Sequence, residues 1–221
     1  MRKSKLASVA LIIYVVSFFT FFTLEGQRSG LNNPDADNPR ESMGFLASHT
    51  DIFTYTGLAS LSMSVSLAIA FIGLEESIYV GKKTTIVKLG LLFGLFAALF
   101  FFGQGILRIQ APGTLLHMSG LNPDWGNSGY VAVQIIGTQG LGSAAGFALS
   151  FAAILLSIDN FQKRRFSRLM SVVGIFGIFT FLVAFFGPIL QDSEIIYPIY
   201  IFSLLLTQIW YLGLGIWAYR N

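Results

Sequence analysis

The chain has 221 residues, of which 54% are hydrophobic and only 11% are charged. An ordinary soluble domain carries about 25% charged residues, so the composition excludes that class. The formal net charge is +3 and there is no cysteine. The lack of cysteine excludes disulfides, thiolate metal sites and cysteine nucleophiles.

The hydrophobic residues gather in six continuous runs, each near the ~20 residues that a helix needs to cross a ~30 Å hydrocarbon core. Strands of a membrane barrel alternate in hydrophobicity, and these runs do not. We therefore predict an all-α integral membrane bundle that forms a single domain over residues 1–221. The first run exceeds the ~7–15 residues of a signal-peptide core, so we expect it to be a span. The predicted spans cover residues 6–24, 52–74, 86–107, 131–158, 170–190 and 195–218.

The basic residues predict the orientation of the bundle. Eleven of the 14 Lys and Arg residues fall on one side of the six runs: Arg2, Lys3, Lys5, Lys82, Lys83, Lys88, Lys163, Arg164, Arg165, Arg168 and Arg220. Only Arg28, Arg40 and Arg108 fall on the other side. Cytoplasmic loops carry the excess of Lys and Arg, so we expect a multi-pass protein of the cell membrane with both termini in the cytoplasm. The anionic inner leaflet accounts for the basic charge, and we expect no nucleic-acid partner.

Two long outer loops are expected, over residues 25–51 and 108–130, because the runs leave these segments between spans. Both contain a similar sequence, Ser29-Gly-Leu-Asn-Asn-Pro-Asp35 and Ser119-Gly-Leu-Asn-Pro-Asp124. Shared turn chemistry explains the similarity, since Gly, Asn-Pro and Asp are common in turns. An internal duplication of a helical hairpin is the alternative.

Polar residues near the outer ends of the spans are candidate ligand contacts. Gln104, Gln134 and Gln139 lie within spans, and Arg108 ends the third span. Amides in membrane helices hydrogen-bond between helices. Arg108 is expected to snorkel to the interface or to form an ion pair. The alternative is a polar ligand pocket in the outer half of the bundle, lined by these four residues.

Arg108 needs an acidic partner for any role in a pathway, and Asp51 and Asp124 are the candidates that we consider. Together with His49 and His117, these two acids also form a candidate metal site on the outer side, because carboxylates and imidazoles suit Zn, Mn or Fe. Their spacing matches no metal motif, and hydrogen-bonded surface histidines are the alternative. We therefore expect no cofactor unless this outer-face metal site exists.

Small residues predict where helices touch. Gly90-x-x-x-Gly94 and Gly142-x-x-x-Gly146 each place two glycines on one helix face, which lets backbones approach closely in a membrane.

Several motifs resemble a family of prokaryotic six-helix membrane proteins known only as a domain of unknown function. They are Leu31-Asn-Asn-Pro-Asp35 after the first span, Phe166-Ser-Arg-Leu-Met-Ser-Val-Val-Gly174 at the fifth, and a last helix that carries tryptophan. Where this chain has Leu169 and Met170, the family usually has a tryptophan. The resemblance implies the fold and membrane location, and it implies no activity.

The sequence contains no catalytic signature. The scarcity of charge within the spans favours a non-enzymatic subunit or accessory protein of a larger membrane complex, whose partners are the lipid bilayer and other membrane protein subunits. Two alternatives are a carrier or receptor for a small neutral or lipidic ligand, and a membrane enzyme with the outer-face metal site.

Overall fold

The computed structural model describes residues 3–30, 39–79, 83–163, 167–179, 182 and 196–220. These residues form helices and contain no strand. The helices are α1 (Lys3–Gly30), α2 (Pro39–Ser48), α3 (Thr50–Ser77), α4 (Thr85–Leu121), α5 (Pro123–Val133), the π-helical segment η1 (Gln134–Gly142), α6 (Ser143–Lys163), α7 (Arg168–Ile175) and α9 (Ile196–Arg220).

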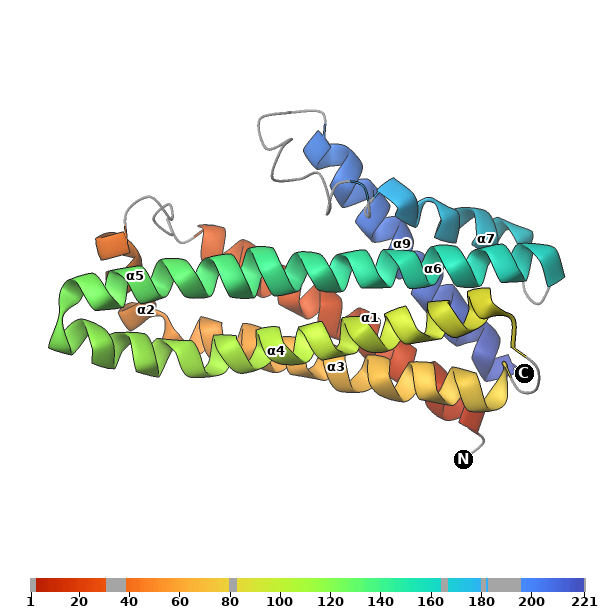
Figure 1. Cartoon of the computed structure of the whole chain (residues 1–221), viewed down its shortest axis with the longest axis horizontal. Helices are drawn as coiled ribbons and strands as arrows, with labels where there is room; N and C mark the ends of the chain where they lie inside the picture. Colours follow the sequence, from red (N-terminus) through yellow and green to blue (C-terminus); the bar gives the residue numbers. More distant parts are fainter. Residues whose placement is uncertain are drawn as a thin grey trace.

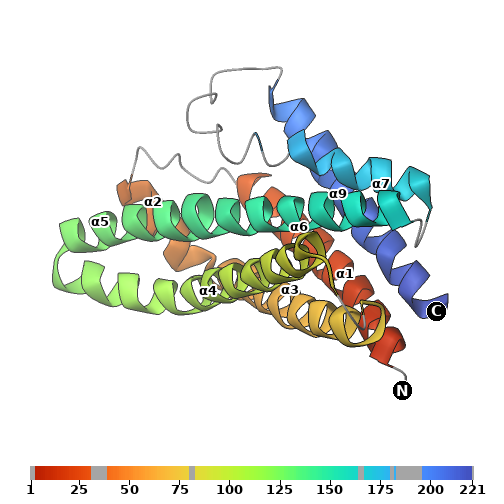
Figure 2. The same cartoon turned by 45° about the vertical axis from the view of Figure 1, so that its right-hand side comes forward.

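The long helices form a bundle in which neighbours in sequence are mostly neighbours in space (Figure 1). α3 packs between α1 and α4, α4 packs on α6, and α6 packs on α7. α9 closes the arrangement by packing on α1 and α7 (Figure 2). Tyr14 of α1 and Trp210 and Tyr211 of α9 are among the largest fully buried side chains, and the rings of Tyr14 and Tyr211 lie 5.5 Å apart between the two helices.

Five helices are long and apolar enough to cross a membrane, as predicted for a multi-pass protein. They cover residues Lys3–Gln27, Thr50–Ser77, Thr85–Leu121, Pro123–Lys163 and Ile201–Arg220. Large apolar side chains such as Val16, Leu99 and Phe202 are 60–63% exposed on their outer faces, which suits a lipid environment. The predicted fifth span, residues 170–190, is described only in part: a shorter apolar helical stretch covers Arg168–Phe179.

The prediction of an outer loop at residues 108–130 is wrong, because these residues are almost entirely helical. α4 continues without a break to Leu121, and α5, η1 and α6 follow as one long helical stretch antiparallel to it (Figure 1). The connection is a tight turn in which the Asn122 side chain accepts a hydrogen bond of 2.9 Å from the Asp124 backbone N–H. Asn at the N-cap followed by Pro at the first helical position is a strong helix start. The sequence Ser119–Asp124 therefore forms the turn between the two helices and the N-cap of α5.

A hydrophobic cluster separate from the main core packs against the C-terminal part of α4 and against α5. α2 and the start of α3 pack there, and the cluster consists of Met43, Phe45, Leu46, Phe53, Leu115 and Tyr130. We call this end of the molecule the cap. The expected loop at residues 25–51 is thus also largely helical, because α1 reaches Gly30 and α2 occupies Pro39–Ser48. Most of the first copy of the repeated sequence lies in residues 31–38, which the structure does not describe.

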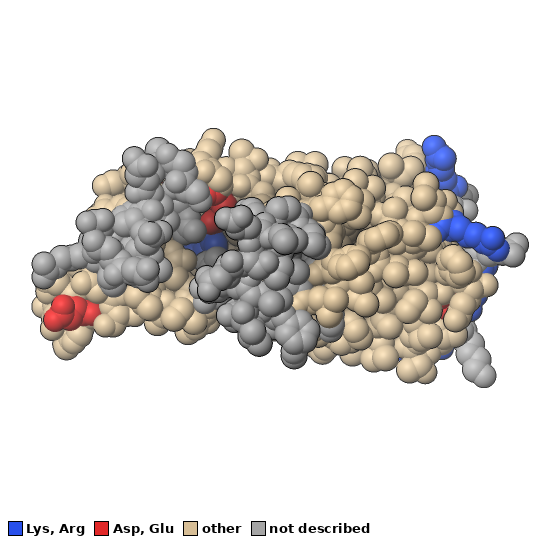
Figure 3. All heavy atoms as spheres, turned by 90° about the horizontal axis from the view of Figure 1, so that it is seen from above, with Lys and Arg blue, Asp and Glu red and all other residues tan. Residues whose placement is uncertain are grey.

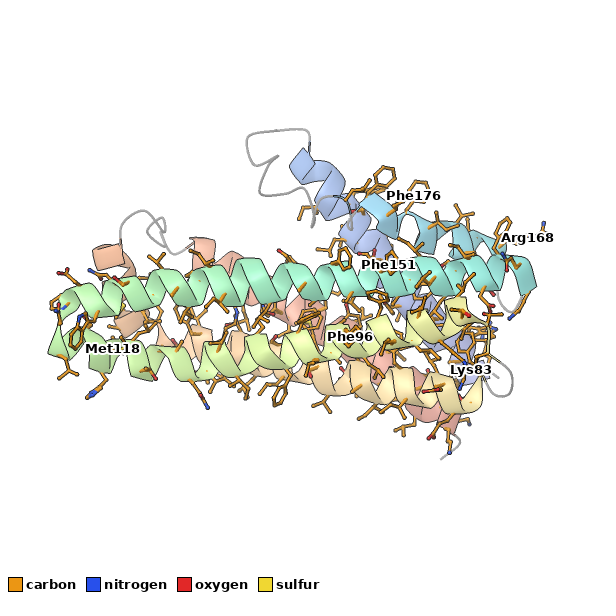
Figure 4. All side chains as sticks on the ribbon, in the orientation of Figure 1. Lys83, Phe96, Met118, Phe151, Arg168 and Phe176 are labelled. Atoms are coloured by element: carbon orange, nitrogen blue, oxygen red, sulfur yellow. The ribbon has the colours of Figure 1, made fainter. Side chains whose placement is uncertain are left out.

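The basic residues gather at the end opposite the cap. Both termini lie at this end, and the face drawn in Figure 3 shows most of its Lys and Arg there. Figure 4 shows Lys83 and Arg168 at this end and Met118 at the cap. Several of these bases are paired: Lys3 lies 2.8 Å from Glu76, and Lys83 lies 2.7 Å from Glu75. The charge asymmetry of the sequence is therefore also an asymmetry of the fold.

Glycines allow the close helix contacts that the small-residue pattern predicts at Gly90 and Gly94. A Cβ at Gly94 would lie 2.3 Å from the ring of Phe71 on α3, and one at Gly90 would lie 3.0 Å from Leu156 on α6. Gly142 similarly faces the side chain of Gln104 at 3.0 Å. Gly146 differs, because a Cβ there would meet no atom of the described residues within 4 Å.

We predict that Gly94→Ala lowers the stability of the bundle by about 1–3 kcal/mol, because the ring of Phe71 must move out of its packed position. Thermal or denaturant unfolding in detergent measures this change. Gly113→Ala is the matched control: it adds the same methyl group to α4 at a position where the described part of the chain has no atom within 4 Å. Equal effects of the two substitutions would contradict the packing.

Candidate functional site

A partly buried ion pair joins α1 to α4. Arg108 of α4 donates from Nη1 to Oε1 of Glu25 on α1, and the two side chains are only 6% and 18% exposed. Arg108 Nη1 also lies 3.4 Å from Thr56 Oγ1 on α3. The guanidinium carbon is 5.0 Å from the ring centre of Phe21, within the range of a cation–π contact. Three helices thus meet around one cation.

Close contact of α3 and α4 places Arg108 beside Thr56. A Cβ at Gly57 would lie 3.0 Å from the backbone oxygen of Gly105, and one at Gly105 would lie 2.9 Å from the backbone oxygen of Gly57. A larger residue at either position would push the helices apart. These two glycines therefore set the position from which Arg108 reaches across to α1.

A second polar contact lies one helical turn along α4 from Arg108. Ser60 Oγ lies 3.0 Å from Gln104 Oε1 and 3.0 Å from the backbone oxygen of Phe101. Gln104 Nε2 donates to the backbone oxygen of Gly137 at 3.2 Å. Gly137 belongs to η1, and π-helical turns are frequent at functional sites. Gln104 is 3% exposed and links α3, α4 and η1.

A pocket of about 260 Å³ lies beside these polar groups. Arg108, Glu25 and Gln104 contribute to its wall. Residues of α1, α3, α4, α6 and α9 line it. Gly146 of α6 is one of them, and a Cβ there would meet no atom of the described residues within 4 Å. The apolar part of the wall includes Phe18, Phe21, Phe22, Met63, Leu149 and Leu204.

The structure brings together part of the predicted ligand-binding set. Gln104 and Arg108 both line the pocket. Gln134 instead lines a cavity of about 20 Å³ under the cap, where Arg108 forms part of the opposite wall. Gln134 Nε2 donates to the Tyr130 hydroxyl at 2.9 Å. The side chain of Gln139 lies outside the described part of the chain.

Glu25 is the site residue that the sequence did not reveal. We considered Asp51 and Asp124 as partners of Arg108, but the observed carboxylate comes from α1, 83 residues away in the chain. Snorkelling of Arg108 is also wrong, because its side chain is buried. Arg108 instead forms an ion pair, which was the alternative expectation, and its partner is Glu25.

The four candidate metal ligands lie near the cap without forming a cluster. Asp51, His117 and Asp124 are exposed. His49 stacks on Phe45 with ring centres 4.4 Å apart, and its Nδ1 lies 3.1 Å from the backbone oxygen of Phe45. Among the described residues, no three His, Asp or Glu side chains are grouped to hold a metal ion.

Comparison of the chain with family models, with curated proteins and with solved structures finds no match in any of the three. The resemblance to the six-helix membrane family therefore stays a prediction. The functional argument depends on the pocket and its ion pair.

We predict that Glu25→Gln lowers stability by about 3 kcal/mol, because it leaves Arg108 as a buried charge without its carboxylate. Unfolding in mixed detergent micelles measures the change. Glu76→Gln is the control, since it breaks the exposed Lys3–Glu76 pair and should cost less than about 1 kcal/mol. A loss for Glu25→Gln as small as the control's would show that the pair is not held in a buried environment.

Proposed function

We propose that this multi-pass membrane protein is a carrier or receptor for a small neutral or lipidic ligand, which binds in the pocket between α1 and α6. The observation that carries the proposal is a mostly apolar pocket of about 260 Å³ with a charged pair and an amide in its wall. Ligand sites are typically apolar cavities with a few convergent polar groups.

The depth of the pocket in the bilayer supports a lipidic ligand. Arg108 lies 23 residues from the start of α4 at Thr85, which is about 35 Å along a helix at 1.5 Å per residue. Glu25 lies at nearly the same distance from Lys3 on α1. The hydrocarbon core of a bilayer is ~30 Å thick. If its inner surface lies at the basic end of the bundle, its outer surface lies near the ion pair. The pocket then opens in the outer half of the membrane, and the cap projects beyond it.

The distribution of charge argues against transport of ions. The described helices carry no charged residue between the basic end and the layer of Arg108 and Glu25; along α4, for example, none lies between Lys88 and Arg108. Relays and ion pathways need ionisable groups within the membrane. A neutral or lipidic ligand needs none.

The interpretation as a subunit of a larger complex stays a prediction that depends on composition, and no contact of the described residues favours it. The metal-enzyme alternative lacks a grouped set of ligands in the same residues. The pocket therefore favours the carrier or receptor among the three functions that the sequence left open.

We predict that Gly146→Phe abolishes ligand binding without unfolding the protein, because the new ring enters the open space of the pocket. Native mass spectrometry of bound lipids, or photolabelling of α1 and α6 by a lipid with a photoreactive tail, measures the loss. Gly113→Phe is the control, because it adds the same ring to α4 outside the pocket lining, at a glycine whose Cβ would meet none of the described atoms within 4 Å. Undiminished labelling in the Gly146 variant would refute the site.

The orientation of the bundle is tested with single cysteines, which the cysteine-free chain makes unambiguous. We expect Asp124→Cys in the cap to react with a membrane-impermeant maleimide on intact cells. Arg220→Cys at the basic end should react only after permeabilisation, because the Lys and Arg excess places that end in the cytoplasm. The reverse pattern of labelling would contradict both the orientation and the outer position of the pocket.

A further inference from the structure

We propose that Gln104 selects the ligand of the pocket, and that this ligand is an uncharged amphiphile whose carbonyl oxygen accepts a hydrogen bond from the Gln104 amide. The proposal rests on the proposed function, since it names the chemical class of the ligand for the same pocket. It concerns one donor atom, Nε2 of Gln104, and the contacts that direct this atom.

The backbone carbonyl of Gly137 fixes the orientation of the Gln104 amide. Gln104 Nε2 lies 3.2 Å from the Gly137 oxygen, and a carbonyl oxygen can only accept a hydrogen bond. A flipped amide would place two acceptor oxygens against each other at this point. The nitrogen is therefore on the side of η1, and the amide oxygen is on the side of α3, where Ser60 Oγ lies 3.0 Å from it.

The amide nitrogen has a second hydrogen to donate. It carries two hydrogens, and the contact with Gly137 uses one of them. Among the described residues, no acceptor binds the second hydrogen. Gln104 is 3% exposed, and a buried donor without an acceptor is unfavourable. A ligand that brings an acceptor atom to this nitrogen therefore gains a hydrogen bond.

The nitrogen lies at the wall of the pocket. Gln104 and Gly142 both line the pocket, and a Cβ at Gly142 would lie 3.0 Å from Gln104 Nε2. The donor is thus next to a second lining residue, on the side where that residue has no side chain. Glycine at position 142 leaves this space to an atom of the ligand.

A carbonyl oxygen suits this donor better than a hydroxyl group. A carbonyl only accepts, whereas a hydroxyl brings a hydrogen that needs an acceptor of its own. Most of the wall cannot supply one, because it consists of apolar side chains: Phe18, Phe21, Phe22, Met63, Phe101, Leu149 and Leu204. The same side chains offer a surface to the hydrocarbon part of an amphiphile.

The experiment uses the full chain in lipid nanodiscs and three probes that share one photoreactive decyl tail. The tail ends in a methyl ketone, in the corresponding secondary alcohol, or in the corresponding alkane. Mass spectrometry of the labelled α1 and α6 peptides gives the half-maximal mole fraction of each probe in the bilayer, which removes the effect of partition into lipid. For the unmodified chain we expect the ketone to label at a mole fraction about fivefold lower than the alcohol and the alkane.

Gln104→Leu removes the donor and nearly keeps the size of the side chain. We expect the half-maximal mole fraction of the ketone to rise to that of the alkane, while that of the alkane does not change. The ratio of the two probes separates recognition from packing, since a purely structural effect would change both alike. Gln134→Leu is the matched control, because it makes the same substitution at an amide outside the pocket lining, and it should keep the fivefold ratio.

Gly142→Ala tests the same contact from the other side. The new methyl group would lie 3.0 Å from Gln104 Nε2, where it displaces the nitrogen or takes the place of the ketone oxygen. We expect the advantage of the ketone to fall below about twofold. Gly113→Ala adds a methyl group outside the pocket lining and should leave the advantage unchanged.

Two results would overturn the proposal: a ketone that labels the unmodified chain no better than the alcohol or the alkane, or an advantage of the ketone that persists in folded Gln104→Leu. The first result needs no variant, so the proposal can be refuted even if Gln104→Leu fails to fold. If none of the three probes labels the α1 and α6 peptides, the proposed function itself fails. Labelling by the alkane that Gly146→Phe reduces, without a preference for the ketone, would refute the role of Gln104 alone.

Discussion

The structure depends on one constraint, which is that Arg108 of α4 carries a charge between packed helices and must be neutralised there. Arg108 is 6% exposed and joined to Glu25, so α1 must pass close to α4 at this level. α3 lies between them only because Gly57 and Gly105 let its backbone approach α4 closely. An isolated charge would be strongly unfavourable in a side chain that is buried this deeply in the protein. The ion pair therefore fixes how three helices are placed relative to one another.

The pocket and the cap follow from this arrangement. Glu25 reaches Arg108 from the end of α1, and residues of α1, α3, α4, α6 and α9 line the pocket beside the pair. Beyond the pair, α4 continues as helix and carries Pro112, whose ring nitrogen has no hydrogen to donate to the carbonyl of Arg108 one turn earlier. The cap cluster around Leu46 and Leu115 holds the extension in place. Arg108 lines both the pocket and the small cavity under the cap, so it is the boundary between the two.

The sequence predicted the helical class and five of the membrane-crossing helices, because the thickness of a bilayer sets the length of each apolar run. It also predicted Gln104 and Arg108 as pocket residues, since polar groups in apolar runs are few. It failed at residues 108–130, where Gln110, Pro112 and Gly113 are typical of a loop and only packing against α2 and α5 maintains the helix. It missed Glu25 as the partner of Arg108, because no periodicity relates residues 83 positions apart.

The most direct test of the account is a double-mutant cycle between Glu25 and Arg108, measured as free energies of unfolding in mixed micelles. The account predicts that Glu25→Gln and Arg108→Gln together cost less than the sum of the two single changes, by about 1–3 kcal/mol, because the second change removes a charge that the first left unpaired. A coupling energy near zero would contradict the account, since it would mean that the two side chains do not interact in the folded protein.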